Sequence, residues 1–184
     1  MYEVELKAWV DDVAALRRRL DERCVFQREF DRRDSYFLAP ECAADSQWRP
    51  RQFRLRRDDE HVVCTYKQKD LTDGVETNLE REFEVSDEQA FRGLIRRLGC
   101  TPLVEKRKRG RLYGYRDMNV ELSEVEGLGY FVEVEKLLPD ETGEADRARA
   151  REEVKAALAA FGVSPGRIEE RPYTLMLREG VQGR

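Results

Sequence analysis

This sequence lacks paired cysteines, a second histidine and long apolar runs. His61 is the sole histidine, which excludes any mechanism that needs two. The four cysteines stand far apart with no C-x-x-C pair, which argues against a zinc site and predicts a reduced, cytoplasmic protein. The sequence has no apolar run of about 18 residues, so no membrane-spanning helix is predicted. It also has no charged segment followed by an apolar one at its start, so no signal peptide is predicted. We therefore expect no membrane association.

Charge is what the sequence has in excess. Charged residues make up 39% of the 184 residues, against roughly a quarter in an average domain. Some of this charge must therefore lie somewhere other than the usual outer surface. The net charge of −4 argues against nucleic-acid binding through the field of the whole protein. It remains compatible with a local basic pocket for a small anion.

Eight stretches are predicted to be β-strands, most of them because apolar and charged residues alternate with period two. They cover residues 1–10, 25–38, 52–56, 62–69, 76–85, 101–113, 118–125 and 130–138. In the first stretch, Tyr2, Val4 and Leu6 share one face, and charged residues occupy the other. Proline and mixed polar residues predict a loop over 39–50.

Three helices are expected between and after these strands. They are predicted over about 11–23, from Ser86 to Gly99, and over about 144–161. The second helix should bury an apolar stripe that includes Leu94 and Leu98. Beyond the third helix, a short apolar group that begins at Tyr173 is expected to dock back on the domain.

On the charged strand faces, charges of the same sign stand two residues apart. The acidic rows are Glu3/Glu5, Glu82/Glu84 and Glu133/Glu135, and the basic rows are Arg54/Arg56 and Lys67/Lys69, joined by Lys7. One interpretation is the solvated face of a one-sided antiparallel sheet. The other is a closed sheet with its apolar face under the helices and a charged tunnel inside. Like-charged neighbours need compensation, and a polyphosphate with a hard divalent cation would supply it.

Several motifs together resemble the CYTH, or triphosphate tunnel metalloenzyme, superfamily. They are the opening E-x-E-x-K (Glu3 to Lys7), D-x-Y-F (Asp34 to Phe37), R-x-R (Arg54 to Arg56), K-x-K (Lys67 to Lys69), E-x-E (Glu82 to Glu84) and the V-E-G-L-G-x-F-x-E-x-E block (Val125 to Glu135). Their order is also that of the family, and the match runs from residue 1 to about 135. The D-x-Y-F motif and the V-E-G-L-G block look most like class IV adenylate cyclases.

The resemblance implies an α+β fold, an eight-stranded antiparallel β tunnel closed into a barrel with helices packed outside. The whole chain, 1–184, would form one CYTH-like domain. Its tunnel strands would lie within about 1–138, and its C-terminal helix and docking tail within about 142–180. The oligomeric state stays open, and a homodimer is one possibility.

For function, the resemblance implies a metal-dependent enzyme that acts on ATP or another triphosphate. The first hypothesis is an adenylate cyclase, which converts ATP to cyclic AMP and pyrophosphate. The first alternative is a triphosphatase that hydrolyses tripolyphosphate, thiamine triphosphate or a nucleoside triphosphate. The second alternative is a polyphosphate-binding module without catalysis. No nucleic-acid partner is expected.

The resemblance also implies roles for the charged rows. Glu3, Glu5, Glu133 and Glu135 would hold Mg²⁺ or Mn²⁺, and Glu82 and Glu84 are possible additional tunnel carboxylates. The triphosphate would be bound by Arg54, Arg56, Lys67 and Lys69, with help from the basic run Lys106, Arg107, Lys108 and Arg109. Lys7 would orient the nucleophile or help to hold the triphosphate. Alternation allows either Lys106 with Lys108 or Arg107 with Arg109 to face the tunnel, and the sequence leaves this register open.

The chain departs from the family pattern at one position of the site. The family usually has Leu-Asp before the V-E-G-L-G block, whereas this chain has Leu122-Ser123. If that aspartate helps to hold a metal, Glu121 or Glu124 would have to substitute for it. The binding-module hypothesis depends on this departure.

Overall fold

The structure is a computed structural model that describes residues 1–40, 52–72 and 74–180, without the side chains of Gln68 and Lys69. Most of the loop predicted at 39–50 lies outside these residues. In chain order the elements are β1 (Tyr2–Trp9), α1 (Val13–Arg23), β2 (Val25–Leu38), β3 (Gln52–Asp58), β4 (His61–Thr72), β5 (Val75–Glu84), α2 (Glu88–Arg97), β6 (Thr101–Tyr115), β7 (Met118–Val125), β8 (Gly129–Leu138), α3 (Glu144–Ala160), the short 3₁₀ turn η2 (Pro165–Arg167) and α4 (Tyr173–Glu179).

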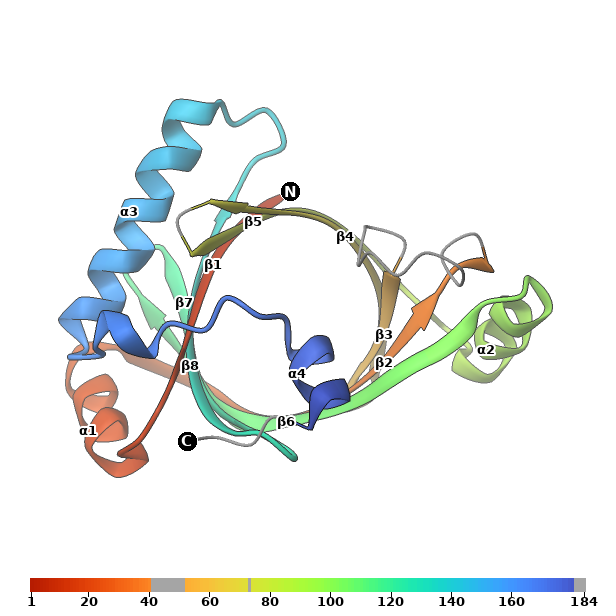
Figure 1. Cartoon of the computed structure of the whole chain (residues 1–184), viewed down its shortest axis with the longest axis horizontal. Coiled ribbons are helices and arrows are strands. Elements are labelled where there is room, and N and C mark those ends of the chain that lie inside the picture. The colour runs from red at the N-terminus through yellow and green to blue at the C-terminus, as the bar shows by residue number, and fades with distance from the viewer. Residues whose placement is uncertain (41–51, 73, 181–184) are drawn as a thin grey trace.

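The eight strands form one closed barrel in the order β1-β5-β4-β3-β2-β6-β7-β8. Every neighbouring pair is antiparallel. Figure 1 shows the ring of strands end-on, with α1 and α3 on one side and α2 on the other. The predicted α+β fold, a closed eight-stranded antiparallel barrel with helices outside, is confirmed. Because side chains alternate along each strand, closure separates an inner set from an outer set.

Two helices cover the outer face of β1, β7 and β8. Val4 and Leu6 of β1 pack with Leu16 of α1 and Val154 of α3 in the largest apolar cluster. All four side chains are almost completely buried. The predicted apolar face of the first strand is therefore the outside of the barrel, and its charged face points inward.

The third external helix, α2, packs on the outer face of β2, β3 and β4. Ile95 of α2 joins Phe37, Leu55 and Cys64 in a second apolar cluster. The predicted apolar stripe is only partly buried, because Leu94 and Leu98 are 53% and 62% exposed. A single short helix offers one face to a convex barrel, so the outer part of a wide stripe stays in solvent.

Local signals set the helix boundaries. The side chain of Asp12 accepts a hydrogen bond from the backbone N–H of Ala15 at the start of α1, and Asp87 does the same for Ala90 in α2. Gly99, just after α2, adopts the left-handed conformation that favours glycine, with φ of 83°. The helices predicted from 11 and from Ser86 therefore begin slightly later, after their capping aspartates.

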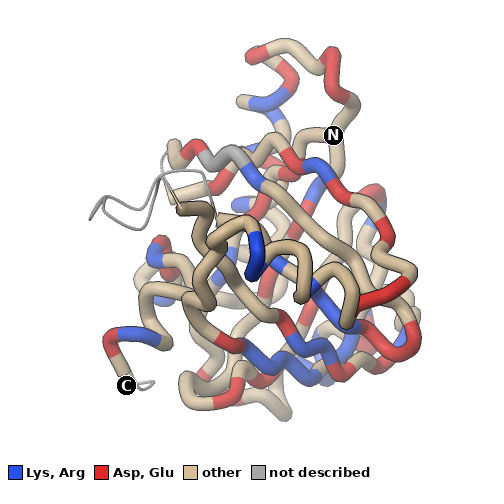
Figure 2. The backbone as a smooth tube through the Cα atoms, turned by 90° about the vertical axis from the view of Figure 1, so that its right-hand side faces the viewer, with Lys and Arg blue, Asp and Glu red and all other residues tan. Residues whose placement is uncertain are grey.

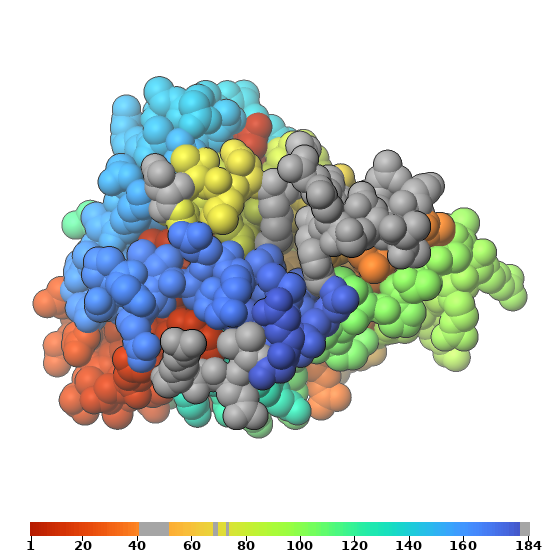
Figure 3. Space-filling model, in the orientation of Figure 1, coloured from red at the N-terminus to blue at the C-terminus, as the bar shows by residue number. Residues whose placement is uncertain are grey.

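The C-terminal segment returns to the barrel and covers part of one end. Ile168 forms a β-bridge with Ala8 of β1, and α4 lies across the barrel end that faces the viewer in Figures 1 and 3. Tyr173 and Met176 are buried against the turn between β7 and β8 and against Phe131. The tail therefore packs on the barrel through both contacts. Among the described residues, no helix is long and apolar enough to cross a membrane.

Candidate active site

The inward-facing side chains line a cavity of about 1050 Å³ inside the barrel. All eight strands contribute charged side chains to its wall, and Tyr173 contributes from α4. Figure 2 shows basic and acidic residues interspersed along the strands. The volume is at the upper end of the range typical of ligand pockets, and it is ample for a polyphosphate chain.

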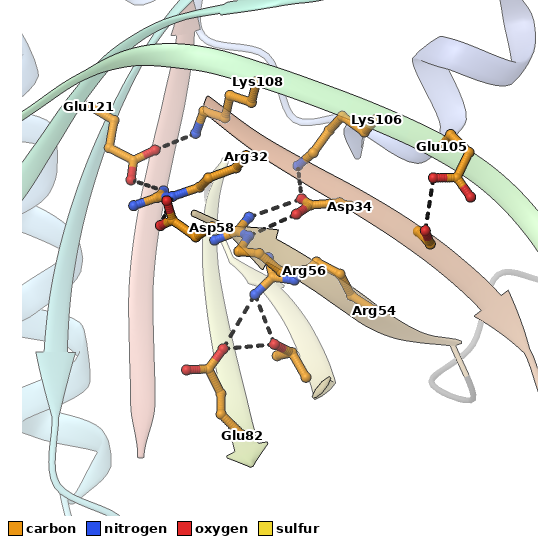
Figure 4. Close-up of polar contacts among 12 residues, drawn as sticks. Arg32, Asp34, Arg54, Arg56, Asp58, Glu82, Glu105, Lys106, Lys108 and Glu121 are labelled. Atoms are coloured by element: carbon orange, nitrogen blue, oxygen red, sulfur yellow. Dashed lines mark hydrogen bonds and ion pairs between the residues drawn. The ribbon is translucent and has the colours of Figure 1, made fainter. Parts of the chain in front are cut away.

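One side of the cavity wall is organised by a buried aspartate (Figure 4). Asp34 accepts hydrogen bonds from Nε and Nη2 of Arg56 at 2.8 and 2.9 Å, and Nζ of Lys106 lies 3.0 Å from its Oδ2. Burial alone would raise the pKa of Asp34, but Arg56 and Lys106 hold it well below its usual range. Asp34 therefore stays ionised and fixes two cations at the wall, and both cations retain donors for a second anion.

Two further cations face the cavity from β3 and β4. Nη2 of Arg54 lies 2.9 Å from Oγ1 of Thr65 and 3.3 Å from Oε1 of Glu82. Nζ of Lys67 contacts Glu3 and lies 3.1 Å from Oε2 of Glu80. Of the basic rows predicted on these two strands, Arg54, Arg56 and Lys67 therefore point into the cavity, where Arg54 and Lys67 meet carboxylates of neighbouring strands.

A third group of charges lies on β2, β6, β7 and β8. Lys108 contacts the carboxylates of both Glu121 and Glu133, and Arg32 contacts Glu121 from the opposite side. Nε of Arg32 also donates to Asp58 at 2.9 Å. Burial would raise the pKa of Glu121, but Lys108 and Arg32 lower it far below the usual glutamate value.

In contrast, Glu5 of β1 lies among other carboxylates. Glu5 is the direct cross-strand partner of Glu76 on β5 and of Glu135 on β8. Cross-strand partners lie about 5 Å apart at Cβ, so their repulsion is strong in a buried site. Burial, with added repulsion from Glu3 and Glu5, raises the pKa of Glu135 to about 8. A bound cation would relieve this repulsion.

The carboxylates around Glu5 therefore suit a hard divalent ion, which prefers oxygen ligands. No three metal-ligating side chains already converge on one point among the described residues. Glu3 and Glu133 contact Lys67 and Lys108 instead. Holding a cation here would require these carboxylates to leave their lysine partners.

The structure resolves the register of the basic run in β6. Lys106 and Lys108 line the cavity and are almost completely buried. Arg107 and Arg109 lie outside the barrel, where Arg107 donates to Asp31 and Arg109 to Glu124. The assignment of Arg107 and Arg109 to the tunnel is therefore wrong, because alternate residues of a strand face opposite sides.

The acidic row of β5 is also only partly inside. Glu82 lines the cavity at its edge with a side chain 51% exposed, whereas the Glu84 side chain is 82% exposed, near His61. Glu84 is thus not a tunnel carboxylate. In β5 the pairing with β1 ends at Leu79, so Glu82 and Glu84 lie beyond the end of the neighbouring strand β1. Lys69 pairs with Asn78 in the sheet, but its side chain lies outside the described part of the structure.

The carboxylate that the family carries at position 123 has a counterpart nearby. Ser123 is buried and lies on the inner face of β7, and Glu121, two residues earlier on the same face, lines the cavity. Glu124 faces outward and pairs with Arg109. Of the two candidate substitutes, only Glu121 is in the cavity.

Sequence reasoning gave no role to several residues that the structure places in the site. They are Arg32, Asp34, Glu76, Glu80 and Tyr173. Strand parity with a predicted inward residue would have found Glu76 and Glu80, since they share the face of Glu82. Arg32 and Asp34 share a face with each other, but the sequence placed no residue of their strand in the tunnel. Tyr173 carries no such signal, because its position depends on how α4 docks.

A closed antiparallel barrel with a charged interior is the architecture of a tunnel protein. The CYTH domain family matches residues 1–165, and this chain belongs to that family. A Methanocaldococcus jannaschii protein named "Putative adenylate cyclase" is 27% identical over 174 residues, 94% of this chain and 97% of its own.

Solved structures share the fold over nearly the whole chain. A Pyrococcus horikoshii protein is 29% identical with a TM-score of 0.81, covering 96% of this chain and 99% of its own. A Hippeastrum protein, named a "Putative adenylyl cyclase" with a dominant triphosphatase activity, is 19% identical with a TM-score of 0.65, covering 97% of this chain and 96% of its own.

The low pKa of Asp34 predicts an acid-sensitive barrel. A carboxylate whose folded pKa lies below its unfolded value of about 3.9 stabilises the protein above that value, and the stabilisation is lost as pH falls toward the folded pKa. Asp34→Asn should lower the free energy of unfolding at pH 7 by roughly 3–5 kcal/mol, because Arg56 and Lys106 lose their buried partner. It should also flatten the decline of stability below about pH 5. Urea denaturation from pH 3 to 8 measures both effects.

Asp146 on α3 provides the control, because it is exposed. Asp146→Asn should reproduce the wild-type curve. A curve for Asp34→Asn that coincides with the wild type at every pH would contradict the proposed anchoring of the two cations.

Proposed function

We propose that this protein is a metal-dependent enzyme that acts on a triphosphate substrate inside the barrel, and that its reaction is the conversion of ATP to cyclic AMP and pyrophosphate. The observation that supports this proposal is the pairing of two kinds of surface in one cavity. Fixed cations of β3, β4 and β6 line part of the wall, and crowded carboxylates around Glu5 line another part. A metal-bound triphosphate complements both.

The basic side chains would bind the phosphate oxygens. Arg54 and Arg56 can each form two parallel hydrogen bonds with a phosphate, whereas Lys67, Lys106 and Lys108 act as point charges. Asp34 holds Arg56 and Lys106 in place before the substrate arrives, so little ordering is needed on binding. Phosphoryl transfer needs mainly such positioning and charge stabilisation.

The carboxylates Glu3, Glu5, Glu133 and Glu135 would hold Mg²⁺ or Mn²⁺, with Glu76 and Glu121 nearby. Bound there, the cation would supply activation of the attacking oxygen and neutralisation of charge on the leaving phosphate. Lys7, almost completely buried and 3.8 Å from Glu76, would orient the nucleophile or contact the phosphate chain.

A triphosphatase is the second candidate. The two reactions differ in the atom attacked: the ribose 3′-hydroxyl attacks the α-phosphorus in a cyclase, and water attacks the γ-phosphorus in a hydrolase. The Hippeastrum protein of the same fold is described with a dominant triphosphatase activity. This description of a protein with the same fold is the observation that favours a triphosphatase as the alternative.

A product assay separates these functions. The protein would be incubated with ATP, tripolyphosphate or thiamine triphosphate, with Mg²⁺ or Mn²⁺, at neutral and alkaline pH. We expect cyclic AMP and pyrophosphate in equal amounts from ATP. Orthophosphate without cyclic AMP would instead identify a triphosphatase. Binding without any product would favour the non-catalytic module.

The role of the β1 carboxylates has a matched test, because Glu5 lines the cavity and Glu84 does not. Glu5→Gln should lower turnover by at least about 100-fold, since the variant loses a charge at the metal site. Glu84→Gln should keep wild-type activity. Initial rates across a Mg²⁺ titration measure the effect, and full activity in the Glu5 variant would show the metal assignment to be wrong.

The register of β6 predicts a second contrast. Lys106→Gln should weaken tripolyphosphate binding by about tenfold or more, because it removes a buried charge from the cavity wall. Arg109→Gln removes an equal charge from the outer face, so its affinity should stay unchanged. Isothermal titration calorimetry compares the two, and equal losses would refute a specific phosphate site at Lys106.

A further inference from the structure

The side chain of Tyr173 enters the phosphate-facing part of the cavity from outside the barrel strands. It is only 9% exposed, and it lines the cavity with its neighbours Pro172 and Thr174. Its hydroxyl is completely buried and has no hydrogen-bond partner among the described residues. A buried hydroxyl without a partner is costly, so this one calls for an explanation.

Three lysines surround the Tyr173 ring. The Nζ atoms of Lys106, Lys7 and Lys108 lie 4.9, 5.4 and 5.9 Å from the ring centroid. These distances are within the range of cation–π attraction. The ring therefore helps to gather three ammonium groups from β1 and β6 at one place in the cavity, and the unpaired hydroxyl belongs to the same side chain.

The position of Tyr173 is well determined by its surroundings. Its ring packs edge-on against Phe131 with the centroids 4.9 Å apart, and Met176 on the next turn of α4 is fully buried. The segment before α4 is fastened to β1, because Trp9 donates to Glu169 at 3.0 Å and the Glu169 N–H donates to the Lys7 carbonyl at 3.0 Å. Tyr173 is thus held against the strand that carries Glu3, Glu5 and Lys7.

We propose that Tyr173 is a substrate-binding residue whose hydroxyl donates a hydrogen bond to a phosphate oxygen of the bound chain, at the point where Lys7, Lys106 and Lys108 meet. This inference rests on the proposed function, and it makes the C-terminal tail part of the phosphate site. Burial and the nearby Glu5 raise the pKa of Tyr173 well above its usual value, so the hydroxyl keeps its proton and can donate.

Stacking on a nucleotide base is the competing role for an aromatic residue in this cavity. The surroundings of Tyr173 argue against it, because three ammonium groups crowd the ring and Phe131 packs against it. A purine does not complement such a cluster, whereas a phosphate does. The hydroxyl should therefore contribute equally to binding of ATP and of inorganic tripolyphosphate.

Tyr173→Phe tests the proposal, because it keeps the ring and removes only the hydroxyl. In calorimetric titrations with sodium tripolyphosphate, with and without Mg²⁺, we expect the dissociation constant to rise about tenfold or more, the usual effect of losing a hydrogen bond to a charged group. The rise with ATP should be similar. The free variant should unfold at a higher temperature than the wild type, because a buried polar group without a partner has been removed.

Tyr113→Phe is the matched control. Tyr113 is a fully buried tyrosine whose hydroxyl donates to Asp21 at 2.9 Å on the outer face of the barrel. Its variant should show the opposite pattern, with lower thermal stability and unchanged tripolyphosphate affinity. If Tyr173 had a purely structural role, its variant would, like Tyr113→Phe, leave the tripolyphosphate affinity unchanged.

Several results would overturn the proposal. Unchanged tripolyphosphate affinity in Tyr173→Phe would do so, and so would a loss confined to ATP. If the wild type itself binds no triphosphate, the proposed function and this inference both fail. If the wild type binds and Tyr173→Phe binds equally well, only this inference fails. Should the variant not fold, amide exchange of the wild type decides: tripolyphosphate should slow exchange in α4, and an unchanged rate there would refute contact with the tail.

Discussion

A closed barrel with a charged interior can be stable only where each inward charge meets an opposite one. Asp34 shows the constraint most clearly, because it has no exposed surface and lies between Arg56 and Lys106. Glu121 fills the same role between Arg32 and Lys108. Buried ion pairs of this kind add little net stability, because desolvation offsets most of the attraction. The stability of the fold must therefore come mainly from the apolar outer face, where α1, α2 and α3 pack.

The site lies where this pairing is incomplete. Glu5 has carboxylates as direct partners on both neighbouring strands, and burial together with repulsion from Glu3 and Glu5 raises the pKa of Glu135 to about 8. On another part of the wall, the Tyr173 hydroxyl has no partner among the described residues, and the three lysines around its ring gather there although each also meets a carboxylate. One region suits a cation and the other an anion. Departures from full satisfaction of charge are expected at functional sites, and here their signs complement a metal-bound polyphosphate.

Period-two alternation predicted the strands and most inward residues, because it directly encodes which face a strand residue occupies. Closure into a barrel was implied by the resemblance to the CYTH family, because alternation alone left a one-sided sheet open. The sequence could not choose between Lys106 and Arg107, because four basic residues in succession present no contrast between the faces. The alternation of side chains also placed Glu84 inside the barrel. Alternation contains no information about where a strand extends beyond its neighbour. The exposure of Leu94 and the position of Tyr173 depend on how a helix docks, which is a tertiary property that local patterns do not encode.

Membership of the CYTH family does not determine which reaction the barrel catalyses, and the position of Tyr173 offers a reason. The motifs that identify the family lie on the strands, where they hold cations and carboxylates at fixed positions. Attack at the α-phosphorus and attack at the γ-phosphorus need the same charges but a chain shifted by two phosphate groups. Only residues that contact the end of the chain or the organic group can set that shift. Tyr173 and Thr174 of α4 line the same cavity but lie beyond the residues that the family model matches, so this part of the wall can vary while the strand motifs stay constant.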